Sequence, residues 1–312
     1  CEDTNVESTN IEQTLLSLID ADEALGLDGF DDGDAIEGDY ESGLEQEGFF
    51  KMLADSIDPE SGIRIRYGKR ITGVVREVEF TDLGNDTIIG VITKTISGNF
   101  IIVALDTADD DTIFWNKTFT TDFIRKVRFV QIDTVSSDST DGWRINALTV
   151  GVGVTGNKVD IEKIEFFRPD GAVPLYSFEG DVTSLFIARD EIPTFEAWRS
   201  IRIEVTVTNS GPEFPFRSGE TVALHYGHQR GQKGRRMMND MGLFADGTAL
   251  DNVFSALWLV HGPGRNPQND QPLQRRTFRG FADVIDFGTL YSEDDAVNSV
   301  FWALPYRSMR GN

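Results

Sequence analysis

The side chains best placed to do chemistry in this chain are the charged ones, because they are separated by sign along the sequence. Residues 1–62 contain nineteen Asp or Glu and one Lys, a net charge of −18, while the whole chain carries −23. From Arg217 to Arg279 the balance reverses, with nine Lys or Arg against five Asp or Glu. Opposite charges on two parts of one chain attract each other and orient the contact that they form.

The acidic segment and the basic stretch therefore supply the two sides of a predicted contact. The basic side chains lie mostly in "GHQRGQKGRR" and "HGPGRNPQNDQPLQRR", whose glycines and prolines are typical of loops. Two arrangements are open: the acidic segment folds onto its own basic loops, or it reaches those of a neighbouring copy. A repeated heterologous contact of the second kind builds a ring or a filament. On the acidic side the candidates are Asp20, Asp22, Glu23, Asp28, Asp31, Asp32 and Asp34. On the basic side they are Arg230, Lys233, Arg235, Arg236, Arg275, Arg276 and Arg279.

Composition excludes several classes of protein. A net charge of −23 with a pI near 4.4 repels phosphate backbones, so we predict no nucleic-acid partner. No apolar run approaches the roughly 20 residues that span a bilayer. With a single cysteine the chain has no internal disulfide.

That single cysteine is the first residue, and a short acidic stretch follows it in "CEDTNVESTN". Cys1 followed by a polar tether resembles the mature start of a bacterial lipoprotein. The resemblance implies that acyl chains on Cys1 hold the protein to a membrane surface, as lipid anchors do. Glu2 and Asp3 resemble the export signals of surface lipoproteins. We therefore expect a location at the bacterial cell surface or outside the cell, with the lipid as the only membrane contact.

Metal and catalytic motifs are sparse. The three histidines, His225, His228 and His261, lack the spacing of a zinc site, and surface or turn positions explain them more simply. In "DGFDDGDAIEGD" Phe30 stands where an EF-hand needs an oxygen ligand. The acidic run "DTADDD" offers Asp109, Asp110 and Asp111 as irregular Ca²⁺ ligands, with a solvated acidic loop as the alternative. We predict no catalytic site and no cofactor other than this candidate Ca²⁺.

The amino-terminal part is predicted to be an α+β domain. "NIEQTLLSLIDADEAL" places apolar residues at helical spacing over about 10–24, and "LEQEGFFKMLADSI" predicts a second helix. From Ile63 onward the period changes to two, with turns predicted at "TDLGNDT" (81–87) and "SGN" (97–99). Helices followed by an antiparallel meander that ends in "DGWRI" resemble the SnoaL-like cone fold. We assign residues 1–9 to an acidic tether and residues 10–150 to this domain.

Residues 151–312 are predicted to form an all-β sandwich with long basic loops. In "SIRIEVTVTNSGP" the apolar residues Ile201, Ile203, Val205 and Val207 alternate with polar ones. Strands recur every 8–15 residues with no helical pattern between them, which resembles an immunoglobulin-like or fibronectin-III-like sandwich.

These patterns together predict a structural protein and not an enzyme. We expect a secreted or cell-surface lipoprotein that assembles with itself into a filament, tube or surface layer through acidic-to-basic contacts. The alternative is a monomeric surface lipoprotein that binds a glycan or another ligand through the sandwich. Coplanar exposed aromatic side chains would favour that alternative.

Overall fold

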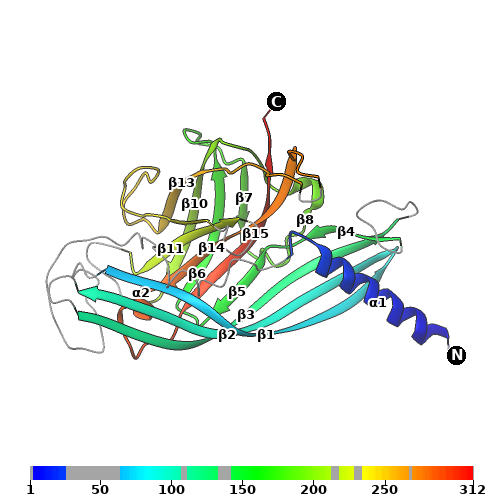
Figure 1. Ribbon diagram of the computed structural model, residues 1–312, viewed down its shortest axis with the longest axis horizontal. Coiled ribbons are helices and arrows are strands. Elements are labelled where there is room, and N and C mark those ends of the chain that lie inside the picture. The colour runs from blue at the N-terminus through cyan, green and yellow to red at the C-terminus, as the bar shows by residue number, and fades with distance from the viewer. Residues whose placement is uncertain are drawn as a thin grey trace.

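The computed structural model describes residues 3–25, 64–106, 111–132, 142–211, 218–227, 234–266 and 269–311, which form a mostly β protein (Figure 1). Strands account for 61% of the structure and helices for 8%, and only α1 (Asp3–Ala21) has seven or more helical residues. The predicted α+β domain, with helices followed by a meander, is therefore wrong. The second helix that we predicted, over 44–57, lies outside the described residues.

The larger of the two sheets has eleven strands and is antiparallel apart from one short parallel pairing. Its main path runs β1-β2-β3-β5-β15-β14-β11-β12, while β4, β8 and β9 pair at its margins. The strands of the path are β1 (Arg64–Gly84), β2 (Thr87–Asp106), β3 (Asp111–Gln131), β5 (Gly151–Thr155), β15 (Ser299–Met309), β14 (Arg275–Asp286), β11 (Glu220–Gly227) and β12 (Gly234–Met237). The marginal strands are β4 (Trp143–Leu148), β8 (Ile187–Ala188) and β9 (Thr194–Glu196).

The first hairpin confirms one predicted turn and overturns the other. Asn85 and Asp86 connect β1 to β2 with φ of 52° and 57°, the left-handed pair that a two-residue hairpin turn requires. The "SGN" at 97–99 is not a turn but lies inside β2. A Cβ on Gly98 would lie 2.4 Å from the carbonyl oxygen of Arg70, so this glycine permits close approach of two strands.

The long strands β1, β2 and β3 curl, so that their two halves face different cores. Near one end their buried side chains, among them Phe100 and Trp115, pack against Phe281 and Phe301 of β14 and β15. Near the other end, where Asn85 and Asp86 connect β1 to β2, Ile92 and Phe129 belong to the larger core. A register shift between Ile71 and Gly73 of β1 marks the change.

The smaller sheet covers the opposite face of β11, β14 and β15, which are therefore buried on both sides. It has the order β13-β10-β6-β7. Strand β10 (Ser200–Asn209) alternates between buried and partly buried side chains over most of its length, as its sequence predicts. The two sheets face each other as in a β-sandwich, although an immunoglobulin-like topology remains a prediction. The other strands of this sheet are β6 (Val159–Phe167), β7 (Tyr176–Glu179) and β13 (Val253–Leu259).

Helix α1 covers the hairpin ends of β1, β2 and β3 (Figure 1). Leu15, Leu18 and Ile19 lie on one face of the helix and are buried against the sheet. Burying each such side chain contributes roughly 1.5–3 kcal/mol. The helix begins at Asp3, inside the stretch that we predicted as an acidic tether. Neither α1 nor the short α2 (Phe287–Tyr291), the α-helices of the described part, has the length and apolarity that crossing a membrane requires.

The predicted boundary between residues 150 and 151 falls within the larger sheet. Strand β5 begins at Gly151 and pairs with β3 on one side and with β15 on the other. Because residues 10–150 supply one helix and strands of a sheet shared with the carboxyl-terminal part, a SnoaL-like domain cannot be assigned to them.

Candidate functional site: an acidic turn beside an arginine groove

The acidic residues at the end of α1 are each paired with an arginine of the same chain. Asp20 accepts a hydrogen bond from Arg76 of β1. Asp22 accepts one from Arg189, which lies in a short 3₁₀ helix, η2 (Arg189–Glu191). The Glu23 carboxylate lies 3.7 Å from the guanidinium of Arg276, which is on β14. Three elements far apart in the sequence thus converge on one turn of the chain.

The carboxyl-terminal end of a helix carries a partial negative charge, which acidic side chains at that end would reinforce. The last turn of α1 contains no basic residue. Positive charge comes instead from outside the helix, through the three ion pairs and through Arg125. The Arg125 guanidinium is buried and donates hydrogen bonds to the carbonyl oxygens of Ala24 and Ala303, the first at 3.0 Å. Burial lowers the pKa of Arg125 to about 10, so it stays charged at neutral pH.

Directly beside this turn is an open groove of about 410 Å³ at the paired ends of β14 and β15. Glu23 forms part of its wall, together with residues of both strands and of the loop that precedes β14. Arg307 pairs with Thr277 across the two strands, so the guanidinium-bearing positions lie close together. The other residues that line the groove are Asn266, Leu273, Arg275, Arg276, Thr277 and Arg307.

The groove has an excess of positive charge. Burial lowers the pKa of Arg307, and the nearby charges of Arg275 and Arg189 lower it further. Within the described part of the chain, Glu23 is the only carboxylate that lines the groove. Guanidinium groups present several N–H donors in one plane and bind carboxylate, sulfate or phosphate groups in a bidentate manner. The arrangement is suited to binding an anionic group.

The structure separates the basic residues that the sequence grouped together. Arg275 and Arg276 line the groove. Arg235 of β12 lies 4.4 Å from the ring centre of Tyr67 and so packs against the curled part of β1. Arg236 is exposed on β12, and Arg279 lies further along β14. Arg230 and Lys233 lie outside the described residues.

On the acidic side the structure describes Asp20, Asp22 and Glu23. The pair Glu23–Arg276 joins the two predicted sets. The sequence reasoning did not include Arg76, Arg125, Arg189 or Arg307, because they lie outside the basic stretch from Arg217 to Arg279. Cys1, Asp28, Asp31, Asp32 and Asp34 lie outside the described residues.

A second cluster, of carboxylates, lies in the loop between β12 and β13. Oxygens of Asp240, Asp246 and Asp251 all lie within 4.8 Å of one another, and this spacing could hold a cation such as Ca²⁺. Burial raises the pKa of Asp240, although its oxygens accept hydrogen bonds from Ser218 and from two main-chain N–H groups. The three aspartates lie within "NDMGLFADGTALDN", a signal that we did not use. Our earlier Ca²⁺ candidates, Asp109 and Asp110, lie outside the described residues, as does the side chain of Asp111.

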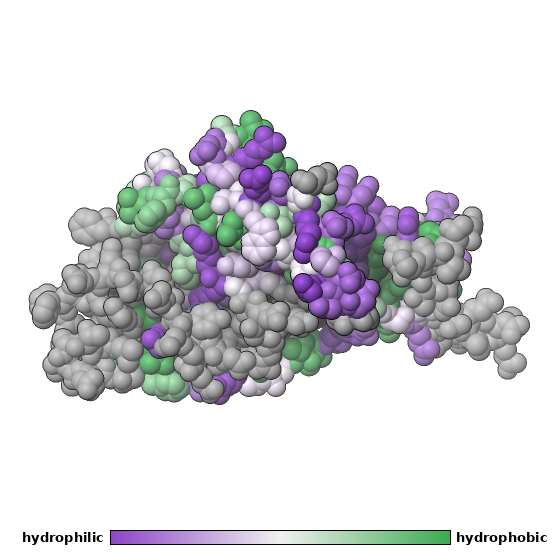
Figure 2. Space-filling model, turned by 45° about the horizontal axis from the view of Figure 1, so that its top comes forward, coloured by the Kyte–Doolittle hydropathy of each residue, from purple (hydrophilic) through white to green (hydrophobic). Residues whose placement is uncertain are grey.

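The same loop carries apolar side chains on its surface. Leu243 and Phe244 are 56% and 97% exposed, and Met241 and Leu250 are also exposed. Figure 2 shows apolar residues over this loop, at the upper left of the molecule.

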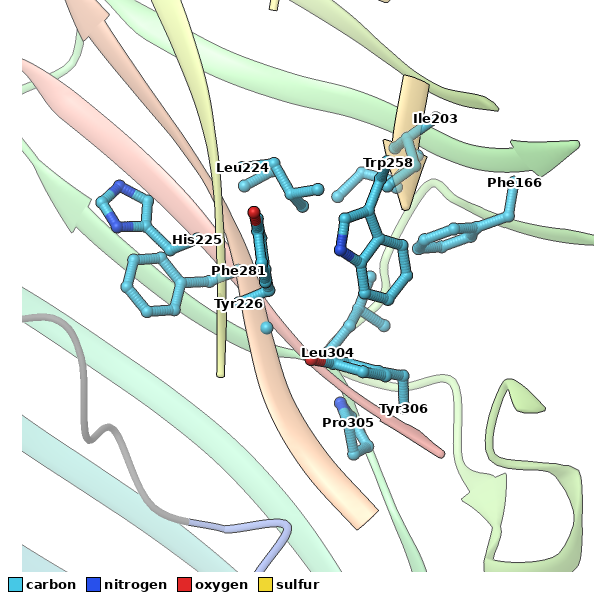
Figure 3. Close-up of a pocket in the computed structure, with 13 residues that line it drawn as sticks. Phe166, Ile203, Leu224, His225, Tyr226, Trp258, Phe281, Leu304, Pro305 and Tyr306 are labelled. Carbon is cyan, nitrogen blue, oxygen red and sulfur yellow. The ribbon is translucent and has the colours of Figure 1, made fainter. Parts of the chain in front are cut away.

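The described histidines do not share a site. His225 is buried on β11 and lies 4.0 Å from Asp283, whereas His261 accepts or donates a hydrogen bond of 2.6 Å with the hydroxyl of Tyr306. Figure 3 shows His225 near a cavity between the two sheets, which Trp258 and Tyr306 also line. Its volume of about 30 Å³ has room for little more than one water molecule. We therefore assign no ligand to this cavity.

The sequence matches no protein-family model, and comparison with curated proteins finds no significant match.

Proposed function

We propose that this chain is a secreted or cell-surface lipoprotein that acts as a structural, self-assembling subunit. In this proposal the arginine groove, defined by Arg275, Arg276 and Arg307, is the basic side of a contact between copies. Acidic residues of the next molecule supply the other side. The observation that carries the proposal is a groove with three guanidiniums and a single described carboxylate, Glu23, in a chain whose net charge is −23.

The position of Glu23 supports this assignment in a second way. The acidic segment continues from residue 26 to residue 62 with twelve Asp or Glu and one Lys. Glu23, three positions before this segment, lies at the groove and contacts Arg276. The remaining carboxylates of this segment are the natural counterions for Arg275 and Arg307. When the acidic segment of one copy pairs with the groove of the next, the contact joins two different surfaces and therefore has a direction.

Charge reversal in the groove tests the proposal. We expect the full chain to sediment as oligomers at low ionic strength and to dissociate near 1 M salt, where the Debye length falls to about 3 Å. The double variant Arg275→Glu/Arg307→Glu should sediment as single chains under both conditions. The matched control is Arg144→Glu, because Arg144 is an exposed arginine on β4 outside the groove. Single chains of the unmodified protein at low salt and high concentration would contradict the proposal.

The alternative, glycan binding through the sandwich, has less support among the described residues. Four of the five tryptophans are buried, and Trp198 is 70% exposed. Within the part of the chain that the structure describes, the other exposed aromatic side chains are Phe114 on β3 and Phe244 in the β12–β13 loop. These three lie on different elements and do not form the row of coplanar rings that a sugar-binding platform uses.

A further inference from the structure

A lysine and an aspartate face each other in the interior of the curled sheet. The amino group of Lys69 on β1 lies 2.8 Å and 3.1 Å from the two carboxylate oxygens of Asp283 on β14. Both residues are at most 2% exposed. They are 214 positions apart in the sequence, and their strands are not neighbours in the sheet. The contact therefore crosses the core that the curl encloses.

The surroundings of this pair are largely aromatic. Phe100 and Phe281 belong to the core on this side of the sheet. The ring of His225 stacks on Phe281 with 4.4 Å between the ring centres, and its Nε2 lies 4.0 Å from an Asp283 oxygen. Figure 3 shows His225 and Phe281 side by side, across the strand from Trp258. The pair is therefore shielded from bulk water, which cannot replace either partner.

We propose that Lys69 and Asp283 condense to an amide that covalently joins β1 to β14. One proton passes from the ammonium to the carboxylate, which leaves a neutral amine and a carboxylic acid. The amine nitrogen then attacks the carboxyl carbon, and a C–N bond forms. A second proton passes from that nitrogen to the departing hydroxyl, the C–O bond breaks, and one water molecule leaves. The His225 ring, whose Nε2 lies 4.0 Å from an Asp283 oxygen, relays this proton after approaching by about 1 Å. The reaction requires no oxidant, reductant or further substrate.

The proximity of the amine and the carboxyl group would accelerate this condensation. The amine nitrogen lies within 3.1 Å of both carboxylate oxygens and is thus held next to the carboxyl group that it attacks. Reacting groups held about 3–3.5 Å apart reach effective molarities of roughly 10⁵–10⁸ M. Removal of water from the site also favours the condensation over the reverse hydrolysis.

Two other lysines of the chain provide internal controls. Lys163 lies 2.8 Å from Glu165, but on the water-facing side of the smaller sheet, with its side chain 34% exposed. Lys117 is buried, but its amino group donates to the carbonyl oxygens of Thr289, Ser292 and Asp295 and to no carboxylate that the structure describes. Neither lysine combines a carboxylate partner with a dry site, so we expect both to remain free amines.

Mass spectrometry of the full recombinant chain tests the proposal. The intact mass of the unfolded protein should fall below the mass of its sequence by one water molecule. A tryptic digest should contain residues 67–70 covalently joined to residues 280–307, since trypsin does not cleave after an acylated lysine. Lys69→Arg keeps the positive charge but cannot form this bond, and it should restore the full mass. In His225→Phe, which keeps a ring to stack on Phe281, the unlinked fraction should rise severalfold.

An unmodified protein with its full mass, and with residues 67–70 recovered only as free peptides, would overturn the proposal. A loss of water that maps to any other peptide would overturn it equally. The test does not depend on the assembly of the protein, so its outcome is independent of the function proposed above.

Discussion

Strand β14 carries two charged contacts that differ chiefly in their access to water. At its start Arg276 pairs with Glu23, whose side chain is 51% exposed beside the groove. Seven residues further on, Asp283 pairs with Lys69, and both side chains are 2% exposed. An exposed pair is screened by water and salt, while a buried pair is strongly coupled because water cannot replace either partner. The exposed contact is thus suited to exchange between partners, and the buried one to permanent linkage.

The largest effect should come from breaking the buried contact. Lys69→Met removes the proposed amide and leaves the Asp283 carboxylate in the core without the lysine. The uncompensated buried charge by itself should lower the free energy of unfolding by about 3–5 kcal/mol. Urea unfolding followed by tryptophan fluorescence measures this loss. The matched double variant Lys69→Met/Asp283→Leu removes both charges and should lose clearly less. Equal losses in the two variants would show that the charge of Asp283 is not the cause.

The next effect should come from Arg125, which links the acidic turn to the core. Arg125→Met leaves the carbonyl oxygens of Ala24 and Ala303 without their donor, and an unsatisfied buried acceptor costs about 1–3 kcal/mol. We expect a loss of about 3 kcal/mol in the same assay. Arg128→Met is the control, because Arg128 lies on the same strand but donates to Asn146 in a partly buried position. A smaller loss for Arg125 than for Arg128 would contradict the assigned role.

A small effect is expected at the exposed pair. Glu23→Gln removes one charge from a contact of 3.7 Å, so the free energy of unfolding should change by less than about 1 kcal/mol. Asp270→Asn, which breaks the exposed pair with Arg265, should behave alike. A loss as large as that of Lys69→Met would remove the distinction between the two contacts.

The smallest effect concerns pH. Burial lowers the pKa of His261 below its ordinary value of 6.5. The unfolded chain then binds more protons than the folded one in the window just below pH 6.5. The contribution of His261 to stability is therefore present above pH 6.5 and is lost as the pH falls through that window. Proton NMR of the imidazole should give a midpoint below 6.5, and a midpoint above 6.5 would contradict the burial of this ring.

Local pattern predicted individual strands well but not their arrangement. The alternation of Ile201, Ile203 and Val205 predicted β10, and the residues around Asn85 predicted the first hairpin turn. The turn predicted at residues 97–99 was wrong because the sequence does not distinguish a glycine inside a strand, such as Gly98, from a glycine in a turn. The extent of the larger sheet depends on pairings between distant segments, such as β3 with β5 and β5 with β15, which no local pattern encodes.

The sequence predicted the charge of the candidate site but not which residues form it. Counting charges found Glu23 and Arg276, but Arg307 lies outside the basic stretch from Arg217 to Arg279. Lys69 and Asp283 could not be paired from the sequence, because only the curl of β1 brings residues 214 positions apart into contact. The carboxylate cluster was also missed, because Asp240, Asp246 and Asp251 are separated in the sequence and come together only in the folded loop.

A charge-swap experiment tests most directly the claim that copies bind each other through the arginine groove. One variant reverses the charge of the groove, with Arg275→Glu and Arg307→Glu. The other reverses the charge of the acidic side, with Asp28→Lys, Asp31→Lys, Asp32→Lys and Asp34→Lys. We predict that each variant alone remains a single chain in electron micrographs, and that an equimolar mixture forms assemblies like those of the unmodified protein. A mixture that remains as single chains, beside an unmodified protein that assembles, would contradict the account.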